Sequence, residues 1–309
     1  MMMQFSGICT NKNRTIFYLK EDNYMSQTDV YQLVTNRIIE LLEAGVVPWQ
    51  QPWTGTGNAA YSRVTGKHYS LLNQLLLDKP GEWLTFKQIE ELGGHVNQGE
   101  ESKVVVFWKM LRISETDDAG EEHEKTIPFL AHYHVFHIDQ TTGITPLTQE
   151  EQNAILQPNE TAENVISDYI ENGGPELEIC YSEDALYNFD KDSITVPRQE
   201  QYLNKNEYYS TLFHELVHST GYKDRLNRIK KGHSRNGDAY AKEELIAEIG
   251  ASALCNICNI DNRATLNNSV AYINSWLSTL RGDKKLIVHA SGQAQKAVQY
   301  ILNAGKDEA

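Results

Sequence analysis

The sequence predicts a two-domain α+β protein, and three observations lead to this prediction. A chain of 309 residues suits two domains better than one. The first half alternates turn residues with short apolar runs, which is typical of mixed strands and helices. The second half contains long helical patterns that carry histidines and carboxylates. A polar stretch over residues 146–160 indicates a linker between a first domain at 26–145 and a second at 161–309.

The composition is that of a globular protein with an excess of negative charge. Hydrophobic residues make up 40% of the chain, charged residues make up 23%, and the net charge is −14. Such a charge disfavours bulk attraction to nucleic acid or to an anionic membrane. No apolar run approaches the roughly 20 residues of a membrane helix, and the chain does not start like a signal peptide. We therefore expect a cytoplasmic protein without a membrane partner.

Residues 1–25 show no periodicity, and we expect them to be a disordered leader or to precede the true start. Residues 28–44 then carry apolar side chains at helical spacing, with Gly45 after the end, which predicts a core helix. Further along the first domain we expect a short helix over 85–92 and a strand over 103–111. An acidic segment over 115–124 indicates a solvated loop or hairpin tip, and residues 130–139 alternate as a strand.

The second domain begins with a predicted helix over 162–171, followed by strands over 178–181 and 193–196. Two helices over 267–280 and 286–302 are expected to close it. Between these segments lies His214-Glu215-Leu216-Val217-His218, within a pattern whose apolar residues recur on one helical face. Positions four apart lie one above the other on a helix, so His214 and His218 can hold one metal ion.

The spacing H-E-x-x-H is a known signature of zinc metallopeptidases. In such sites a third protein ligand completes the set, and a fourth position stays open for water. Glu215 would then act as the general base and acid. A pair of surface histidines is the structural alternative. We expect the strand over 193–196 to be the sheet edge that pairs with an extended substrate.

The third ligand is predicted on the next helix, which is apolar nearly all round from residue 245 to 257 and therefore buried. Glu244 and Glu248 lie four apart on one face, and buried carboxylates are costly unless they are paired or bound to metal. We predict Glu244 as the ligand and Glu248 as a partner of a ligand histidine. Glu243 competes with Glu244, and water-facing carboxylates are the structural alternative. Tyr240 is a candidate donor to a developing oxyanion.

The segments FHELVHSTGYKDRL and YAKEELIAEIGA resemble the metallopeptidase domain of ArdC-like antirestriction proteins of conjugative plasmids and related mobile elements. The segments ALYNFDKDSITVP and SVAYINSWLSTLRGDKKLIVHASGQAQKAVQYIL are similar to neighbouring parts of that domain. The resemblance implies a zincin-like metallopeptidase fold for the C-terminal domain. It also implies Glu244 as the third ligand, at the start of an E-x-x-A-E pattern.

The segments PWQQPW, TGKHY and LTFKQ resemble the N-terminal domain of the same family, which is associated with single-stranded DNA binding. Single-strand binders combine basic grooves with aromatic stacking surfaces. Residues 60–112 hold seven cationic and six anionic side chains, so this region is nearly neutral within an acidic chain. Core packing explains each aromatic residue equally well. The candidate contacts with DNA are Trp49, Trp53, Arg63, Lys67, Tyr69, Lys87 and Lys109.

Residues and resemblance together predict a zinc metalloendopeptidase of the antirestriction type, which protects incoming mobile-element DNA from host restriction. Zn²⁺ is the expected cofactor, with Mn²⁺ as an alternative. The expected partners are a protein or peptide substrate, single-stranded DNA and the host restriction machinery. The alternative is a non-proteolytic antirestriction or single-stranded-DNA-binding protein, in which the metal site is structural or vestigial.

Overall fold

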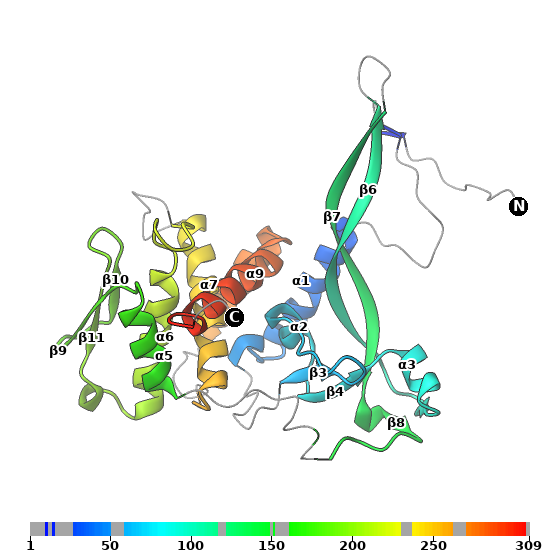
Figure 1. Ribbon diagram of the computed structural model, residues 1–309, viewed down its shortest axis with the longest axis horizontal. Helices are drawn as coiled ribbons and strands as arrows, with labels where there is room; N and C mark the ends of the chain where they lie inside the picture. Colours follow the sequence, from blue (N-terminus) through cyan, green and yellow to red (C-terminus); the bar gives the residue numbers. More distant parts are fainter. Residues whose placement is uncertain are drawn as a thin grey trace, which may run out of the picture.

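The molecule has an N-terminal and a C-terminal lobe, and a long β-hairpin extends from the N-terminal lobe (Figure 1). It consists of β6 (Lys103–Thr116) and β7 (Glu122–His137), which pair antiparallel along their whole length. The computed structural model describes residues 10–11, 14–15, 27–50, 59–116, 122–148, 151, 161–229, 237–261 and 270–306. The strands predicted over 103–111 and 130–139 are therefore parts of longer strands. The acidic segment forms their far ends, and residues 117–121 lie outside the described part.

The N-terminal lobe is built on a four-stranded sheet in the order β3-β4-β7-β6, with β3 (Ala60–Ser62) parallel to β4 (Gly81–Leu84). Strand β4 pairs antiparallel with β7. The remaining elements of this lobe are β1 (Thr10–Asn11), β2 (Arg14–Thr15), α1 (Gln27–Glu43), η1 (Pro48–Gln50), α2 (Leu71–Leu76), α3 (Phe86–Glu91), β5 (His95–Val96), η2 (Ile138–Gln140) and β8 (Thr141–Thr142).

Helix α2 holds two strands of this sheet through consecutive side-chain amides. Asn73 donates to the Val106 carbonyl at 2.8 Å and accepts from the Val106 N–H at 2.8 Å. Gln74 makes the same two-way contact with Ala60, at 2.9 Å and 3.0 Å. Both amides are buried, so these bonds satisfy groups that would otherwise be costly to bury. The sequence analysis missed α2, because its six residues lie in an apolar run without helical periodicity.

The C-terminal lobe packs helices beside a small sheet in the order β10-β11-β9. The strand β11 is central in this sheet, so the prediction that residues 193–196 form its edge is wrong. Among the described strands, β10 forms the edge of this sheet on the side of the candidate site, and its partner there is β11. The elements are α5 (Ala162–Glu171), β9 (Glu176–Cys180), β10 (Leu186–Asn188), β11 (Ser193–Pro197), η3 (Gln199–Gln201), α6 (Lys205–Ser219), α7 (Asp238–Ile257), α8 (Val270–Gly282) and α9 (Leu286–Leu302).

One hydrophobic core connects the two lobes. Val34 and Ile38 of α1 belong to the same buried cluster as Leu280 of α8 and Ile287 of α9. The ring of Trp49 meets that of Trp276 edge-on, with 6.0 Å between centroids. The predicted linker lies outside the described residues except at 146–148 and 151. In the part of the chain that is described, no helix has the length and apolarity to span a bilayer.

Helices α6 and α7 approach closely where α7 has a glycine. A Cβ atom on Gly250 would lie 2.9 Å from the nearest methyl carbon of Val217. We expect Gly250→Ala to reduce the free energy of unfolding by about 1–3 kcal/mol, because overpacking forces the two helices apart. Urea denaturation measures this change. The control is Gly292→Ala in α9, where no atom lies within 4 Å of the added methyl group. Gly292→Ala should instead stabilise by about 0.5–1 kcal/mol, and equal behaviour of both variants would contradict the packing argument.

Candidate metal centre

Helix α6 buries its apolar face and presents its two histidines to a cavity. Asn204 caps the helix by accepting from the Glu207 N–H at 3.0 Å, and Leu212 and Leu216 are buried in the core. The turn between positions 214 and 218 then places both imidazoles on one face. The cavity has a volume of about 510 Å³ and includes His214, Glu215, His218, residues 185–190 and four residues of the α6–α7 region: Ile229, Tyr240, Glu243 and Glu244.

Helix α7 brings Glu244 to the two histidines. The Nε2 atoms of His214 and His218 are 3.0 Å apart. The carboxylate oxygens of Glu244 lie 3.5 Å from His214 Nε2 and 3.4 Å from His218 Nε2. Among the described residues, His214, His218 and Glu244 are the group whose ligand atoms all lie within 4.8 Å of one another. The predicted ligand set is thus assembled from two helices.

These three side chains fit a divalent metal ion. In a tetrahedral site with bonds of about 2.0–2.2 Å, ligand atoms lie roughly 3.3–3.6 Å apart, close to the distances observed here. The donor chemistry points the same way, because two imidazole lone pairs facing each other at 3.0 Å repel unless a cation or a proton lies between them. Two nitrogens and one carboxylate oxygen are a ligand set typical of catalytic zinc sites.

Glu215 is buried at 8% exposure, and its carboxylate borders the same cavity. Its Oε2 accepts a hydrogen bond from the backbone N–H of Tyr187 in β10 at 2.6 Å. This N–H therefore points away from β11 and towards α6. A bond from a fixed backbone donor holds the carboxylate in one orientation.

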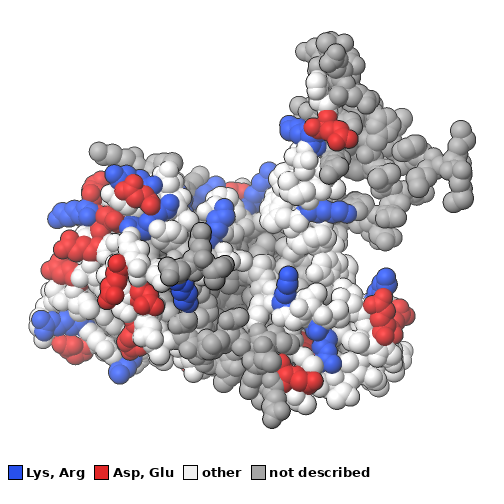
Figure 2. Space-filling model, in the orientation of Figure 1, with Lys and Arg blue, Asp and Glu red and all other residues white. Residues whose placement is uncertain are grey.

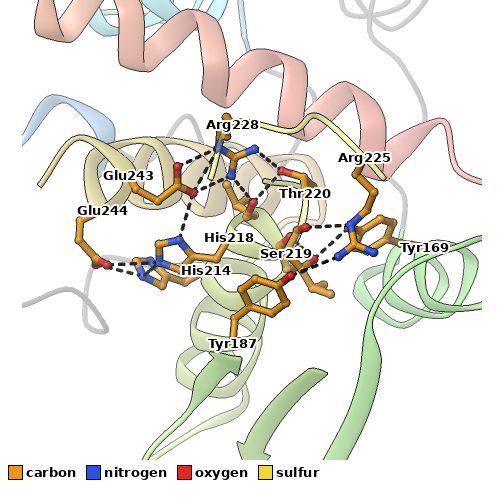
Figure 3. A network of polar contacts seen from close by, with 12 residues as sticks. Tyr169, Tyr187, His214, His218, Ser219, Thr220, Arg225, Arg228, Glu243 and Glu244 are labelled. Carbon is orange, nitrogen blue, oxygen red and sulfur yellow. Dashed lines mark hydrogen bonds and ion pairs between the residues drawn. The ribbon is translucent and has the colours of Figure 1, made fainter. Parts of the chain in front are cut away.

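A second carboxylate of α7, Glu243, contacts the other ring nitrogen of His218, with Oε1 at 3.2 Å from Nδ1 (Figure 3). The sequence analysis assigned this role to Glu248, which is not among the residues that line the cavity. Burial alone would lower the pKa of the His218 imidazole, but Glu243 and Glu244 outweigh it and raise that pKa to about 10. Burial raises the pKa of Glu244, yet its contacts with both histidines leave that pKa lowered.

Two arginines of the loop after α6 form ion pairs beside the site. Arg228 donates to Glu243 through Nε at 2.9 Å and Nη2 at 2.8 Å. Arg225 donates through Nη1 to Asp192 at 3.0 Å, and the Tyr187 hydroxyl donates to the same carboxylate at 2.8 Å. The available sequence signal was a cluster of arginines directly after the H-E-x-x-H helix, but their acidic partners lie 33 and 15 residues away.

Tyr240, the candidate oxyanion donor, lies in the first turn of α7 and lines the cavity. The residues predicted to contact DNA do not form one cluster, in contrast to the candidate metal ligands. Trp49 is only 2% exposed and has no face free for a base, so we exclude it. Arg63 forms an ion pair with the buried Glu82 at 2.5 Å, so its charge is used within the N-terminal lobe. Trp53 lies outside the described residues.

The other candidates lie on the surface, and two of them share a groove. Lys87 pairs with Glu91 at 3.6 Å on α3, and Lys109 is exposed on β6. Lys67 and Tyr69 line a groove of about 530 Å³ between the hairpin and α9. The groove also contains His68, Phe107, Trp108 and Tyr133.

The aromatic residues of this groove come from the stem of the hairpin. Trp108 is 54% exposed, and the rings of Phe107 and Tyr133 lie 5.3 Å apart across the two strands. Figure 2 shows that this stem carries few charged side chains, whereas charges of both signs crowd the C-terminal lobe. The sequence analysis did not single out Phe107 or Tyr133. Its available signal was Phe107-Trp108, since adjacent strand residues point to opposite faces and both cannot enter one core.

Two family models match the chain. Residues 164–293 match a zincin-like metallopeptidase, and residues 28–136 match the N-terminal domain of the anti-restriction factor ArdC. Two solved structures are similar over most of their length. The metal-free ArdC protein of plasmid R388 is 33% identical, with a TM-score of 0.69, 89% of this chain covered and 97% of that one. The Mn(II)-bound form of the same protein is 30% identical, with a TM-score of 0.70, and the match covers 91% of this chain and 100% of that one.

Relatives known by sequence include longer proteins. Two DNA primases named TraC from Escherichia coli are 29% and 30% identical over 305 and 293 residues. These alignments cover 92% and 88% of this chain but only 20% and 27% of the primases. The chain thus spans about a fifth to a quarter of their length. Protein y4eC of Sinorhizobium fredii is 29% identical, with 89% of this chain and 92% of that protein covered.

Proposed function

We propose, from the premise that this chain belongs to the ArdC family of antirestriction proteins, that it protects mobile-element DNA from host restriction through a metallopeptidase centre. The observation that carries the proposal is the convergence of His214, His218 and Glu244, whose ligand atoms lie within 4.8 Å of one another. Glu215 borders the same cavity and is not needed as a ligand. This arrangement supports a metal site with a separate base beside it.

The metal would be held by His214, His218 and Glu244. Zn²⁺ suits two imidazoles and a carboxylate, and Mn²⁺ is supported by the Mn(II)-bound structure of the R388 relative. A divalent cation bound there supplies Lewis acidity toward a water molecule and a carbonyl group.

The chain's own residues would carry the proton transfers and bind the substrate. Glu215 takes a proton from the attacking water and returns it to the leaving amine. The Tyr187 N–H holds the Glu215 carboxylate in place for both steps. The edge strand β10 lines the cavity with residues 185–190, so an extended peptide can lie alongside it. Because the Tyr187 N–H already donates to Glu215, the peptide would bond to the neighbouring backbone groups. Tyr240, which lines the cavity from α7, would donate to a developing oxyanion.

Two assays on the same protein test the proposal. The first compares how efficiently unmodified plasmid DNA enters a restricting host with and without the gene, and we expect higher entry with it. The second incubates the purified chain with an unfolded protein such as casein, with Zn²⁺, Mn²⁺ or a chelator. Cleavage that stops with chelator supports a peptidase. Protection of the DNA without cleavage under any metal condition would instead favour the non-proteolytic alternative.

A second candidate function, binding of single-stranded DNA, is favoured by the groove at the hairpin stem. Bases stack on exposed aromatic faces, and this groove combines Trp108 and Tyr133 with the cationic Lys67. Its polar lining includes Gln88 and Gln295, which can contact bases or sugars. Since few cations are present, we expect stacking to contribute more than phosphate contacts and the salt dependence to be shallow.

We expect Trp108→Ala to weaken binding of a fluorescent oligothymidine by roughly 5- to 150-fold, the equivalent of about 1–3 kcal/mol for one stacked base. Fluorescence anisotropy measures the dissociation constant. The matched control is Phe86→Ala, because Phe86 is 53% exposed on α3 but does not line the groove. Equal weakening in both variants would argue against the groove as the binding site.

A further inference from the structure

The loop that follows α6 folds back onto the end of that helix through two arginines (Figure 3). Arg225 donates through Nε to the Ser219 carbonyl at 2.8 Å. Arg228 donates to the Val217 carbonyl at 2.5 Å and to the Thr220 hydroxyl at 2.6 Å. Both arginines thus add a second donor to carbonyl groups of the last helical turn, which also accept from the backbone N–H groups of Thr220 and Tyr222. Each also pairs with a carboxylate of a neighbouring element.

The two arginines differ in what lies beyond their carboxylate. Asp192, the partner of Arg225, accepts from the Tyr187 hydroxyl, so this branch reaches β10 and the side of the site where Glu215 lies. Glu243, the partner of Arg228, contacts Nδ1 of His218, so the second branch reaches a candidate metal ligand directly. The three side chains of this second branch are nearly buried, with exposures of 9% for Arg228, 8% for Glu243 and 12% for His218.

Glu243 and Glu244 are adjacent carboxylates that both contact the histidine pair. Their different hydrogen-bond partners distinguish a metal ligand from a partner of a ligand. Arg228 grips Glu243 with two nitrogens, a fork geometry that fixes a carboxylate in position and direction. The Glu243 oxygen so fixed lies 3.2 Å from His218 Nδ1. It favours the tautomer with Nδ1–H, whose Nε2 lone pair is on the side of His214 and Glu244, where a metal would bind. Glu244 has no such arginine and is left for the metal position.

We propose that Arg228 is a positioning residue, which through Glu243 fixes the orientation of His218 as a metal ligand. The inference deepens the proposed function and rests on its metal site. Partners of ligand histidines typically contribute about 10- to 100-fold to metal affinity. Arg225, which has the same helix-capping and ion-pairing roles but no path to a ligand histidine, provides a matched control within the same loop.

The test is the dissociation constant for Zn²⁺ and for Mn²⁺, measured on the full chain by competition with a chromophoric chelator. We expect Arg228→Ala and Glu243→Gln each to weaken metal binding about 10- to 100-fold. The double variant should bind no more weakly than the weaker single variant, since both changes break one chain of contacts. Arg228→Lys should be intermediate, because it restores the charge but not the fork. Arg225→Ala should keep the wild-type constant.

Thermal unfolding of the metal-free proteins separates positioning from general damage. If Arg228→Ala does not fold, Glu243→Gln and Arg228→Lys carry the comparison. Wild-type affinity in folded Arg228→Ala would overturn the inference, and so would an equal loss of affinity in Arg225→Ala. Either result would leave the proposed function standing if the wild type binds metal. A wild type that binds neither Zn²⁺ nor Mn²⁺ would overturn both.

Discussion

Glu215→Gln is expected to slow peptide hydrolysis by about 10²- to 10⁴-fold while the metal site keeps its ion. The amide cannot take a proton from water, so the reaction loses its base. The change is nearly isosteric, and the amide oxygen can still accept from the Tyr187 N–H. Because Glu215 is not one of the three converging ligands, metal content should be unchanged. Cleavage rate and metal content are measured on the same preparation.

The control for this prediction is Glu207→Gln, which removes a carboxylate from the first turn of the same helix, away from the cavity. It should cleave at the wild-type rate. A Glu215→Gln protein that cleaves within a factor of ten of wild type would show that another group acts as the base. Protection of DNA in a restricting host should also be scored in this variant. Protection that survives the loss of cleavage would assign the antirestriction effect to binding.

The parts of the fold that could be predicted from sequence are the long elements with a strong period. The helices predicted over 28–44, 162–171 and 286–302 are α1, α5 and α9 to within one residue at each end. Strand β10 has three residues and α2 has six, too few to establish a period. The position of residues 193–196 at the centre of their sheet depends on pairing with distant β9, which local pattern does not encode.

The candidate metal site also has a part that could be predicted from sequence and a part that could not. Spacing alone places His214 and His218 on one face, since that relation is internal to one helix. The choice between Glu243 and Glu244 is not internal, because adjacent helical residues point about 100° apart and the answer depends on how α7 is rotated against α6. The close approach of Gly250 to Val217 is one contact between these two helices, and the hydrogen bonds from Arg228 engage the Glu243 carboxylate. Both are tertiary contacts that a helical pattern does not reveal.

The burial of individual aromatic residues could not be predicted from the sequence either. Trp49 and Trp108 are equally plausible stacking residues by type, yet one is buried against Trp276 and the other is more than half exposed. Burial of a tryptophan depends on what packs around it, and α8 lies more than 200 residues from Trp49 in the sequence. The local charge balance of residues 60–112 does not help with Trp108 either, because it describes the segment and not the surface on which this side chain lies.

His214→Ala and Glu244→Ala are each expected to remove the metal from the purified protein. If the ~10–16 kcal/mol of a structural zinc site is shared equally among four ligands, each contributes roughly 2.5–4 kcal/mol, or on the order of 10²- to 10³-fold in dissociation constant. Atomic emission after gel filtration in the presence of a weak chelator should find about one ion per wild-type chain and none in either variant.

The sharper comparison is between Glu244→Ala and its neighbour. Glu243→Ala should weaken binding without abolishing it, since Glu243 contacts His218 Nδ1 and Arg228 and does not need to touch the metal. If Glu244→Ala kept its ion while Glu243→Ala lost it, the order of the two carboxylates would be reversed. Such a reversal would require Glu243 to leave Arg228, whose buried guanidinium would then lack its carboxylate partner at considerable cost. That cost is the physical reason to expect Glu244 as the ligand.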